Sequence, residues 1–465
     1  MAWNISAGAI RNPVPPIVLI IGLLFAGITA YFRLPINQLP NVDFGALQVT
    51  VSQPGAAPAE METQITQRVE SALTGIEGVH RITSTISPGA SQTLVELEGN
   101  ADISRAVDDA RDALQRIRID LPADITEPVI TRIEAAAEPI AYYVVEREGQ
   151  SPRDISWYID NELSRELLAV RGVSQVTRIG GVSREVRVEV DPQRLQAYGV
   201  SADSVSSQLR LANTDLPGGR AEVGGQAQSI RTLGSAENIK SLAETRITAA
   251  DGRVVRLGDI ATVTDGASEL SSIARYNGSP VVGFMMLRSK AASSVQVYHD
   301  AKARMDELAK ENPDLKFQLI FTEVEFIEGL HEGSIAALIE GAILACIVVF
   351  LVLRDWRATL IAAAAIPLSV IPTFAAIEPF GFTLNMVTLI ALGLVAGVLV
   401  DDAIVEIENI VRHMRMGKSP YQAALEAADE IGLAVVATTC TIIAVFLPVS
   451  FMSGDTGTFF KEFGL

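Results

Sequence analysis

The sequence LNMVTLIALGLVAGVLVDDAIVEIENIVRHMR, residues 384–415, is the most informative stretch of the chain, because an uncharged apolar run leads directly into two adjacent aspartates, Asp401 and Asp402. A carboxylate at the centre of a membrane helix costs roughly 2.5 to 3.5 kcal/mol on insertion scales. Ionisable residues inside membrane helices therefore usually have a function. We interpret the stretch as a membrane helix with a functional pair of acids.

The composition fits a membrane protein better than a soluble enzyme or a nucleic-acid-binding protein. Of the 465 residues, 49% are hydrophobic, and 55 acidic side chains against 37 basic ones give a net charge of -18. Nucleic-acid binding depends on clustered Lys and Arg that face phosphates, and the sequence has no basic tract. The two cysteines, Cys346 and Cys440, lie in apolar runs, so we expect packing roles rather than a disulfide framework or a zinc site.

Five apolar runs have the length that a membrane helix needs, roughly 20 residues. The first is longer than a signal-peptide core and has no small-residue cleavage site behind it, so we interpret it as a retained span. Residues 459–465 begin a further apolar segment, and we therefore expect the chain to be part of a longer protein. The five runs are residues 14–32, 334–353, 359–376, 384–411 and 431–452.

Basic residues in the short loops set the orientation, because cytoplasmic loops carry an excess of Lys and Arg. These loops lie between the second and third runs and between the fourth and fifth, and the amino terminus lies on the same side. The block at residues 34–333 is then predicted to be periplasmic in a bacterium with two membranes. The loop residues that carry the charge are Arg354, Arg357, Arg412, Arg415 and Lys418.

The first part of this block has the pattern of a split β-α-β sandwich. Residues 46–53 alternate apolar and polar side chains at the strand period, and residues 93–98 form a third predicted strand after a Pro-Gly turn. Helices are predicted after the first and third strands, and Asp102 can cap the second of them. The order strand, helix, strand, strand, helix is that of a ferredoxin-like unit.

A second unit of the same kind begins with a strand at residues 140–146, but its second half is delayed. Its remaining elements are predicted at residues 280–288, 293–311 and 315–321. Residues 180–270 therefore form an inserted module, which carries a glycine-rich arm at residues 213–226. The arm fits a hairpin or docking loop, and a mobile surface loop fits the pattern equally well.

No catalytic constellation stands out. The four histidines, His80, His299, His331 and His413, have no nearby nucleophile and no spacing typical of metal ligands, so we expect structural or solvated roles. The sequence has no G-x-x-x-x-G-K-[ST] phosphate loop, so ATP is not indicated as an energy source. We predict that the chain is not an enzyme.

The aspartate pair fits reversible protonation. Gly393, Gly397 and Asp401 follow one another at steps of four residues, so a groove of small residues that admits another helix leads to the first carboxylate. Asp402 points about 100° away from Asp401 around the helix. Two interacting carboxylates in a site of low dielectric constant cannot both ionise freely, which favours proton exchange at the pair.

Three further acids are candidates for a proton path. Glu406 and Glu408 continue toward the predicted cytoplasmic end, which leaves open that the pair is simply solvated there. Glu340 lies in the second run, where it either lines a path or reaches the interface. A sodium site would need several convergent oxygens, whereas proton transfer needs only titratable groups and water. No Lys or Arg lies in the five runs, so a cation that pairs with the aspartates would come from helices outside this sequence.

These residues resemble the resistance-nodulation-division (RND) transporters, and within them the hydrophobe/amphiphile efflux pumps. The resemblance covers the whole chain and is most specific in the fourth run. The stretches that carry it are LPINQLPNVDF (34–44), VTVSQPGAAPAEMETQIT (49–66), NTDLPGGRAEVGGQ (213–226), FLVLRDWRATLIAAAAIPLSVIPTF (350–374), LGLVAGVLVDDAIVEIENI (392–410) and FLPVSFMSGDTGTFFKEF (446–463).

The resemblance implies a proton-driven inner-membrane exporter of twelve spans, of which this chain is the amino-terminal half. Its fold would be an α-helical transmembrane bundle, five spans plus the start of a sixth, with a large α+β periplasmic insertion. Asp401 and Asp402 would be the proton relay, with Gly393 and Gly397 packed beside it. The implied divisions are residues 1–33 (first transmembrane helix), 34–133 (first porter subdomain, ferredoxin-like), 134–179 with 271–330 (second porter subdomain), 180–270 (docking subdomain) and 331–465 (helices two to five and the start of six).

The same resemblance implies the partners. They are a homotrimer in which the docking arm reaches a neighbouring protomer, a periplasmic adaptor protein, an outer-membrane channel, membrane lipid, and hydrophobic or amphiphilic small molecules as substrates. The implied location is the bacterial inner membrane, with several spans, a cytoplasmic amino terminus and a large periplasmic domain. Protons are the coupling ion, and no other cofactor is expected.

The substrate site stays unassigned. Drug pumps of the family line a pocket with phenylalanines, whereas the matching stretches here contain Pro139 and Ile179. Metal-exporting relatives carry one aspartate in the fourth span and use methionine ligands. Met285 and Met286 would point to opposite faces of a strand, which argues against metal export.

Other functional classes stay open. Related helix bundles occur in proton-coupled accessories of protein translocation, in sterol-sensing receptors and in other RND-type transporters. A scaffold that only displays the periplasmic block, without transport, is a further alternative.

Overall fold

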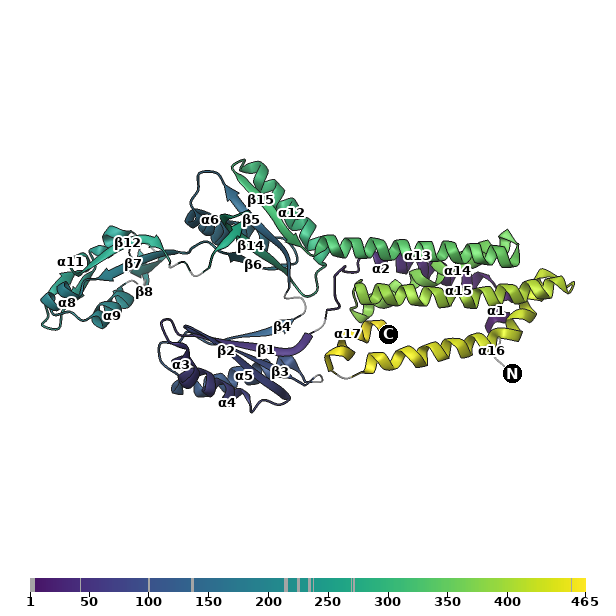
Figure 1. Cartoon of the computed structure of the whole chain (residues 1–465), viewed down its shortest axis with the longest axis horizontal. Coiled ribbons are helices and arrows are strands. Elements are labelled where there is room, and N and C mark those ends of the chain that lie inside the picture. The colour runs from purple at the N-terminus through teal and green to yellow at the C-terminus, as the bar shows by residue number, and fades with distance from the viewer. Residues whose placement is uncertain are drawn as a thin grey trace.

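A computed structural model describes residues 5–41, 43–98, 101–134, 138–212, 216–223, 226–232, 236, 238–268, 270, 272–452 and 454–465. Figure 1 shows a long bundle of helices at one end and an α/β block at the other. Within the described residues, five helices are long and apolar enough to cross a membrane. The chain therefore combines several apolar helices with mixed α/β structure.

The bundle is formed by long helices in the first and last parts of the chain. Two short helices accompany them, α1 (Ile5–Arg11) before the first long helix and α17 (Gly454–Gly464) after the last. The five long helices are α2 (Val14–Tyr31), α13 (Val324–Leu353), α14 (Trp356–Ile377), α15 (Met386–Arg415) and α16 (Pro420–Phe446).

Two of these helices begin earlier than the hydropathy pattern predicts. The α13 helix starts at Val324 rather than at residue 334, because its first turns are polar on one side while Val324 and Ile327 are buried. The α16 helix starts at Pro420 rather than at residue 431, since the Ser419 hydroxyl caps it and proline suits the first helical position. Hydropathy finds the part of a helix that crosses a membrane, and it misses a polar extension.

The first sandwich follows α2 and has the four-stranded antiparallel sheet order β2-β3-β1-β4. The alternation in β1 buries Leu47, Val49 and Val51, which pack against the helices. Asp102 caps α5, since its side chain accepts hydrogen bonds from the backbone amides of Ser104 and Arg105. The strands are β1 (Asp43–Ser52), β2 (Val79–Ser87), β3 (Ala90–Leu97) and β4 (Val129–Glu134); the helices are α3 (Pro58–Met61), a π-helical turn (Glu62–Thr66), α4 (Gln67–Leu73) and α5 (Ile103–Ile117), followed by a 3₁₀ turn (Arg118–Asp120).

The second sandwich has the same relative strand order, because β5 lies between β14 and β15 and β6 pairs with β14. Phe284 is fully buried in its core and stacks on Tyr143 with ring centroids 5.6 Å apart. Its strands are β5 (Pro139–Arg147), β6 (Val173–Ile179), β13 (Ala274–Tyr276), β14 (Ser279–Arg288) and β15 (Leu315–Thr322). Its helices are α6 (Pro152–Tyr158), a π-helical turn (Ile159–Leu163), α7 (Ser164–Leu168) and α12 (Ser294–Glu311).

A separate module interrupts the second sandwich between β6 and β13. It leaves through β7 and returns through β12, which pair with each other along their whole length, and it has its own apolar core. The arm predicted at residues 213–226 contains β8 and the start of β9, while residues 213–215 and 224–225 lie outside the described residues. The module consists of β7 (Arg184–Val190), α8 (Pro192–Tyr198), α9 (Ala202–Ala212), β8 (Leu216–Val223), β9 (Gln226–Thr232), α10 (Ile239–Ala243), β10 (Arg246–Thr248), β11 (Val254–Arg256), α11 (Leu257–Ile260) and β12 (Ala261–Ala267).

The parts follow one another along the long axis of the molecule. Figure 1 shows α13 running directly out of the second sandwich into the bundle, with the inserted module farthest from the helices. The short loops after α13 and α15, which carry the basic residues, lie at the opposite end of the bundle together with the amino terminus. The α/β block and the basic loops are thus separated by the length of the helices.

Gly27 allows α2 and α14 to cross closely, because a Cβ atom at this position would overlap the backbone carbonyl of Ile371. We predict that Gly27→Ala forces the two helices apart and destabilises the protein by about 1–3 kcal/mol, the usual cost of overpacking. Thermal unfolding of the detergent-solubilised protein measures the effect. Gly22→Ala is the matched control on the same helix and should be at least as stable as the wild type, since a methyl group at Gly22 would have no atom within 4 Å outside its own helix and alanine is the better helix former.

Candidate functional site

The aspartate pair lies in the middle of α15, a helix that is firmly anchored at its start. The Asn385 side chain accepts hydrogen bonds from the amides of Val387 and Thr388, and the Thr388 hydroxyl accepts one from the Asn385 amide in return. This capping box satisfies donors that the first turn of a helix would leave free. The helix then continues without interruption through the two acids.

Asp401 faces a hollow between α13 and α15. The hollow has a volume of about 580 Å³ and is bordered on one side by the small residues Ala337, Gly341 and Ala345 of α13. Gly393 and Gly397 of α15 border the other side, two turns and one turn before the carboxylate. Small side chains on both helices leave this space in front of Asp401 open.

The two glycines do not touch another helix in the described part of the chain. A Cβ atom built on either Gly393 or Gly397 would meet no atom within 4 Å outside its own helix. The glycines open the space in front of Asp401, and close packing of a further helix against them stays a prediction.

Asp402 faces a different neighbour, α16. The Thr438 hydroxyl donates to the Val435 carbonyl of its own helix at 2.9 Å and lies 3.5 Å from Asp402 Oδ1, at the outer limit for a hydrogen bond. Asn409, two turns further along the same side of α15, is buried and donates to the carbonyl of Ala427 on α16 at 3.3 Å. The two adjacent carboxylates therefore point to separate environments, one to the hollow beside α13 and the other to α16.

The three other acids are not drawn together with the pair. Glu406 is half-buried one turn after Asp402, and Glu408 is exposed. Glu340 is exposed on α13 and does not border the hollow in the part of the chain that the structure describes. Their role in a proton path therefore stays a prediction. Among the described residues, no group of three His, Cys, Asp or Glu could hold a metal ion.

A charged cluster that the sequence did not predict joins the end of α15 to the start of α16. Arg412 donates to Glu430 Oε1 at 2.7 Å, and His413 Nε2 lies 2.8 Å from Glu430 Oε2. Lys418 pairs with Glu426 one turn before Glu430. Charges of opposite sign in neighbouring runs are the only sequence signal for this cluster, because the partners are brought together by the turn between the helices.

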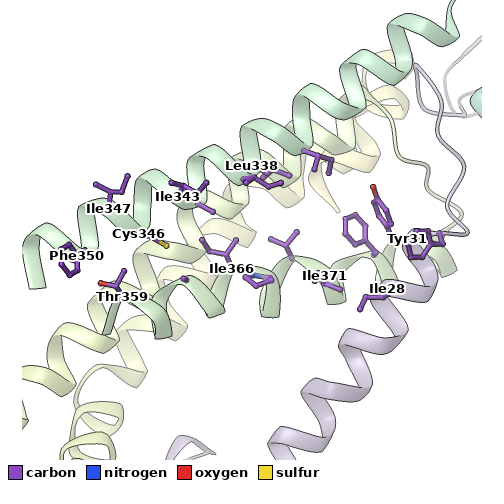
Figure 2. Close-up of a pocket in the computed structure, with 18 of the residues that line it drawn as sticks. Ile28, Tyr31, Leu338, Ile343, Cys346, Ile347, Phe350, Thr359, Ile366 and Ile371 are labelled. Atoms are coloured by element: carbon purple, nitrogen blue, oxygen red, sulfur yellow. The ribbon is translucent and has the colours of Figure 1, made fainter. Parts of the chain in front are cut away.

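An apolar groove lies on the other side of α13, between this helix, α2 and α14. It has a volume of about 900 Å³, and no carboxylate borders it within the described residues. Figure 2 shows aliphatic side chains of α13 and α14 facing each other across it, with Tyr31 at one end and Phe350 and Thr359 at the other. The labelled aliphatic and sulfur-containing residues are Ile28, Leu338, Ile343, Cys346, Ile347, Ile366 and Ile371.

One polar contact marks the Tyr31 end of this groove. The Tyr31 hydroxyl lies 3.0 Å from His331 Nε2, and the two rings stack with centroids 6.1 Å apart. His331, for which the sequence indicates a structural or solvated role, is half-buried against Tyr31. The groove itself was not predicted, because α2 is distant in sequence from α13 and α14, and no local pattern indicates which faces of the three helices meet.

Comparisons with known proteins agree on one family. The family model described as the AcrB/AcrD/AcrF family matches residues 5–465. The protein called multidrug resistance protein MdtC from Escherichia coli O1:K1 is 33% identical over 461 residues, which cover 98% of this chain and 45% of that protein. Proteins of the same name from Klebsiella pneumoniae strain ATCC 700721 and Pantoea ananatis strain AJ13355 are 32% and 33% identical over 458 residues, with the same coverage. The chain thus spans about half the length of the curated relatives it matches.

The hollow in front of Asp401 predicts that its carboxyl group is more accessible to a chemical reagent than that of Asp402. A hydrophobic carbodiimide reacts with protonated carboxyl groups, so we expect it to label Asp401 more than Asp402, whose carboxylate is turned toward Thr438. Peptide mass spectrometry of the membrane-embedded protein measures the site of labelling. Asp401→Asn should remove the label from this peptide, whereas Asp402→Asn should leave it; preferential labelling of Asp402 would contradict the geometry.

Proposed function

Because the chain belongs to the AcrB/AcrD/AcrF family of RND transporters, we propose that it works in a proton-driven efflux pump for hydrophobic or amphiphilic small molecules. The pump takes its cargo from the inner membrane or the periplasm and exchanges it for protons. The observation that carries this proposal is Asp401, a carboxylate in the middle of an apolar helix that faces an open hollow. The name of the relatives, multidrug resistance protein, agrees with export of small molecules.

In this proposal, Asp401 and Asp402 form the proton relay. The charged pair attracts a cation or water, whereas the protonated pair fits an apolar helix interface, so each proton changes which neighbours α15 prefers. The two aspartates face different surroundings. Asp401 would exchange protons with water in the hollow, while Asp402 lies toward α16. A shift of α15 would then alternate the α/β block between open and closed forms.

We further assign the parts of the block. The two sandwiches are the ferredoxin-like porter subdomains, and the module from β7 to β12 is the docking subdomain with β8 and β9 as its arm. The separation of the basic loops from the block supports a periplasmic block and a cytoplasmic amino terminus. A homotrimer, a periplasmic adaptor, an outer-membrane channel and cation partners for the aspartates in a second half of the protein complete the proposed pump.

The apolar groove supports the proposed class of cargo. Its aliphatic lining and lack of carboxylates among the described residues suit the hydrocarbon part of an amphiphile, and it opens among the helices that would lie in the membrane. A polar or ionic cargo would lose its hydration there without new partners.

The relay assignment predicts that Asp401→Asn in the full-length protein abolishes export, because the amide cannot exchange a proton at this position. The amide has nearly the same size as the carboxyl group, so the protein should still assemble in the membrane. Efflux of a fluorescent amphiphile from cells, with the amount of membrane protein measured in parallel, checks both expectations.

Glu340→Gln is the matched comparison, because it removes a carboxylate from an exposed face of α13 outside the hollow. We expect it to keep most of the export activity. Normal export by Asp401→Asn would refute the relay, and loss of export by Glu340→Gln would add this residue to the proton path.

The cargo assignment predicts that filling the groove slows export. Ala363 borders the groove on α14, so Ala363→Trp should occupy the space of the cargo and reduce efflux of apolar compounds several-fold. Ala364→Trp adds the same side chain on the exposed side of α14 and is the control. Equal efflux rates for the two variants would show that cargo does not pass through the groove.

A further inference from the structure

Residues 34–41, which we call the strap, lead from the end of α2 to the start of β1 and bind the segment just before α15. The Leu384 amide donates to the Pro35 carbonyl at 2.9 Å, and the Asn37 amide donates to the Leu384 carbonyl at 3.0 Å. Ile36 and Leu384 thereby form a parallel β-bridge. The strap is thus hydrogen-bonded to the root of the helix that carries the aspartate pair.

The opposite side of the strap binds the second sandwich. Asn37 Oδ1 accepts hydrogen bonds from the Ser294 amide at 2.9 Å and the Ser294 hydroxyl at 3.2 Å. The Ser293 hydroxyl accepts a hydrogen bond from the Ile36 amide and donates one to the Ile36 carbonyl, both at 3.1 Å. Ser293 caps α12 and Ser294 is its first residue, so the strap holds the N-terminal end of this helix.

These contacts are buried, so they bind the parts firmly. Asn37 is 1% exposed, Ser294 4% and Leu384 0%. Breaking a buried hydrogen bond leaves a polar group without a partner, and this costs more free energy than the intact bond contributes to stability. The bonded groups are therefore expected to move together rather than separate. The α12 helix in turn packs Val297 and Ala301 into the core of the second sandwich, so a displacement of its first turn reaches that core.

The α15 helix is the continuous connection between the aspartates and the strap. Asp401 lies 15 residues after Met386, which corresponds to about 22 Å at ~1.5 Å per residue. The capping box at Asn385 keeps the first turn of α15 intact, so an axial shift at Asp401 moves Leu384 as well. The α13 helix is already continuous with the second sandwich, whereas α15 reaches this sandwich through the strap.

We propose that the strap transmits displacement of α15 to α12 and that Asn37 is the positioning residue of this link. The inference rests on the proposed function, since it takes protonation of the aspartate pair as the event that moves α15. Asn37 binds both sides at once, because its backbone amide donates toward α15 and its side-chain oxygen accepts from α12. The hydrogen bonds between Ile36 and Ser293 are a second contact of the strap with α12.

Two substitutions separate the link from a general effect on folding. Asn37→Leu has a similar size but accepts no hydrogen bond from Ser294, so it should lower the rate of export by about tenfold, as expected for the loss of buried hydrogen bonds. Asn37→Asp keeps the acceptor, and a negative charge is favourable at a helix N-terminus. Asn37 Nδ2 has no hydrogen-bond partner among the described residues, so replacing it with a carboxylate oxygen breaks no hydrogen bond, and Asn37→Asp should keep export.

Hydrogen exchange of the full-length protein in lipid nanodiscs distinguishes the proposed link from a purely structural role of Asn37. A purely structural role would not change the pH response of α12 separately from that of α15. Exchange is measured at pH 5.5 and 7.5 and corrected for the intrinsic effect of pH. In the wild type and in Asn37→Asp, we expect peptides of α15 and of the first turn of α12 to respond to pH together. In Asn37→Leu, α15 should still respond, whereas the response of α12 should be clearly smaller, since only the Ile36–Ser293 contact remains.

The outcomes distinguish the link from the relay. A normal α12 response and normal export in Asn37→Leu would overturn the role of the strap, and so would an equal loss of both responses, which would mean that Asn37 only supports the fold. Asp401→Asn tests the proposed function separately. If this variant kept both responses, the relay assignment would fail, while Asn37→Leu would still decide whether α12 follows α15.

Discussion

A carboxylate in an apolar helix must be protonated, hydrated or paired, and α15 carries two of them side by side. The structure meets this constraint by turning the two groups toward different surroundings. Asp401 faces a hollow lined by small residues of α13 and α15, and Asp402 approaches Thr438 on α16. Larger side chains at Gly341 or Gly397 would fill the space in front of the first carboxylate.

The connections between the bundle and the block follow from the same arrangement. The α13 helix continues from β15 and has Val324 in the core of the second sandwich, so these two parts form one body. The α15 helix begins in a network of caps and main-chain bonds and reaches the sandwich through the strap. One long helix is therefore continuous with the block, while the acid-bearing helix beside it is joined to the block by the buried hydrogen bonds of the strap.

Local patterns predict much of the secondary structure. The alternation at residues 46–53 corresponds to β1 (Asp43–Ser52), and the delayed strand predicted at 280–288 corresponds to β14 (Ser279–Arg288), which pairs with β5 across more than a hundred intervening residues. Hydropathy places the starts of α13 and α16 too late, because it does not register polar helical turns. The separation of Asp401 from Asp402 around the helix is also predictable, since it depends only on helix geometry.

The apolar helices, the two acids within one of them and the strands and helices of both sandwiches can be inferred from the sequence, because each depends on the spacing of neighbouring residues. The family is recognised instead from the resemblance of long stretches, above all residues 392–410. What surrounds the acids, where the apolar groove lies and how Asn37 joins Leu384 to Ser294 depend instead on the tertiary structure. These features arise where the faces of separate helices and loops meet. Their physical cause is the packing of complementary faces, which no local period or motif records.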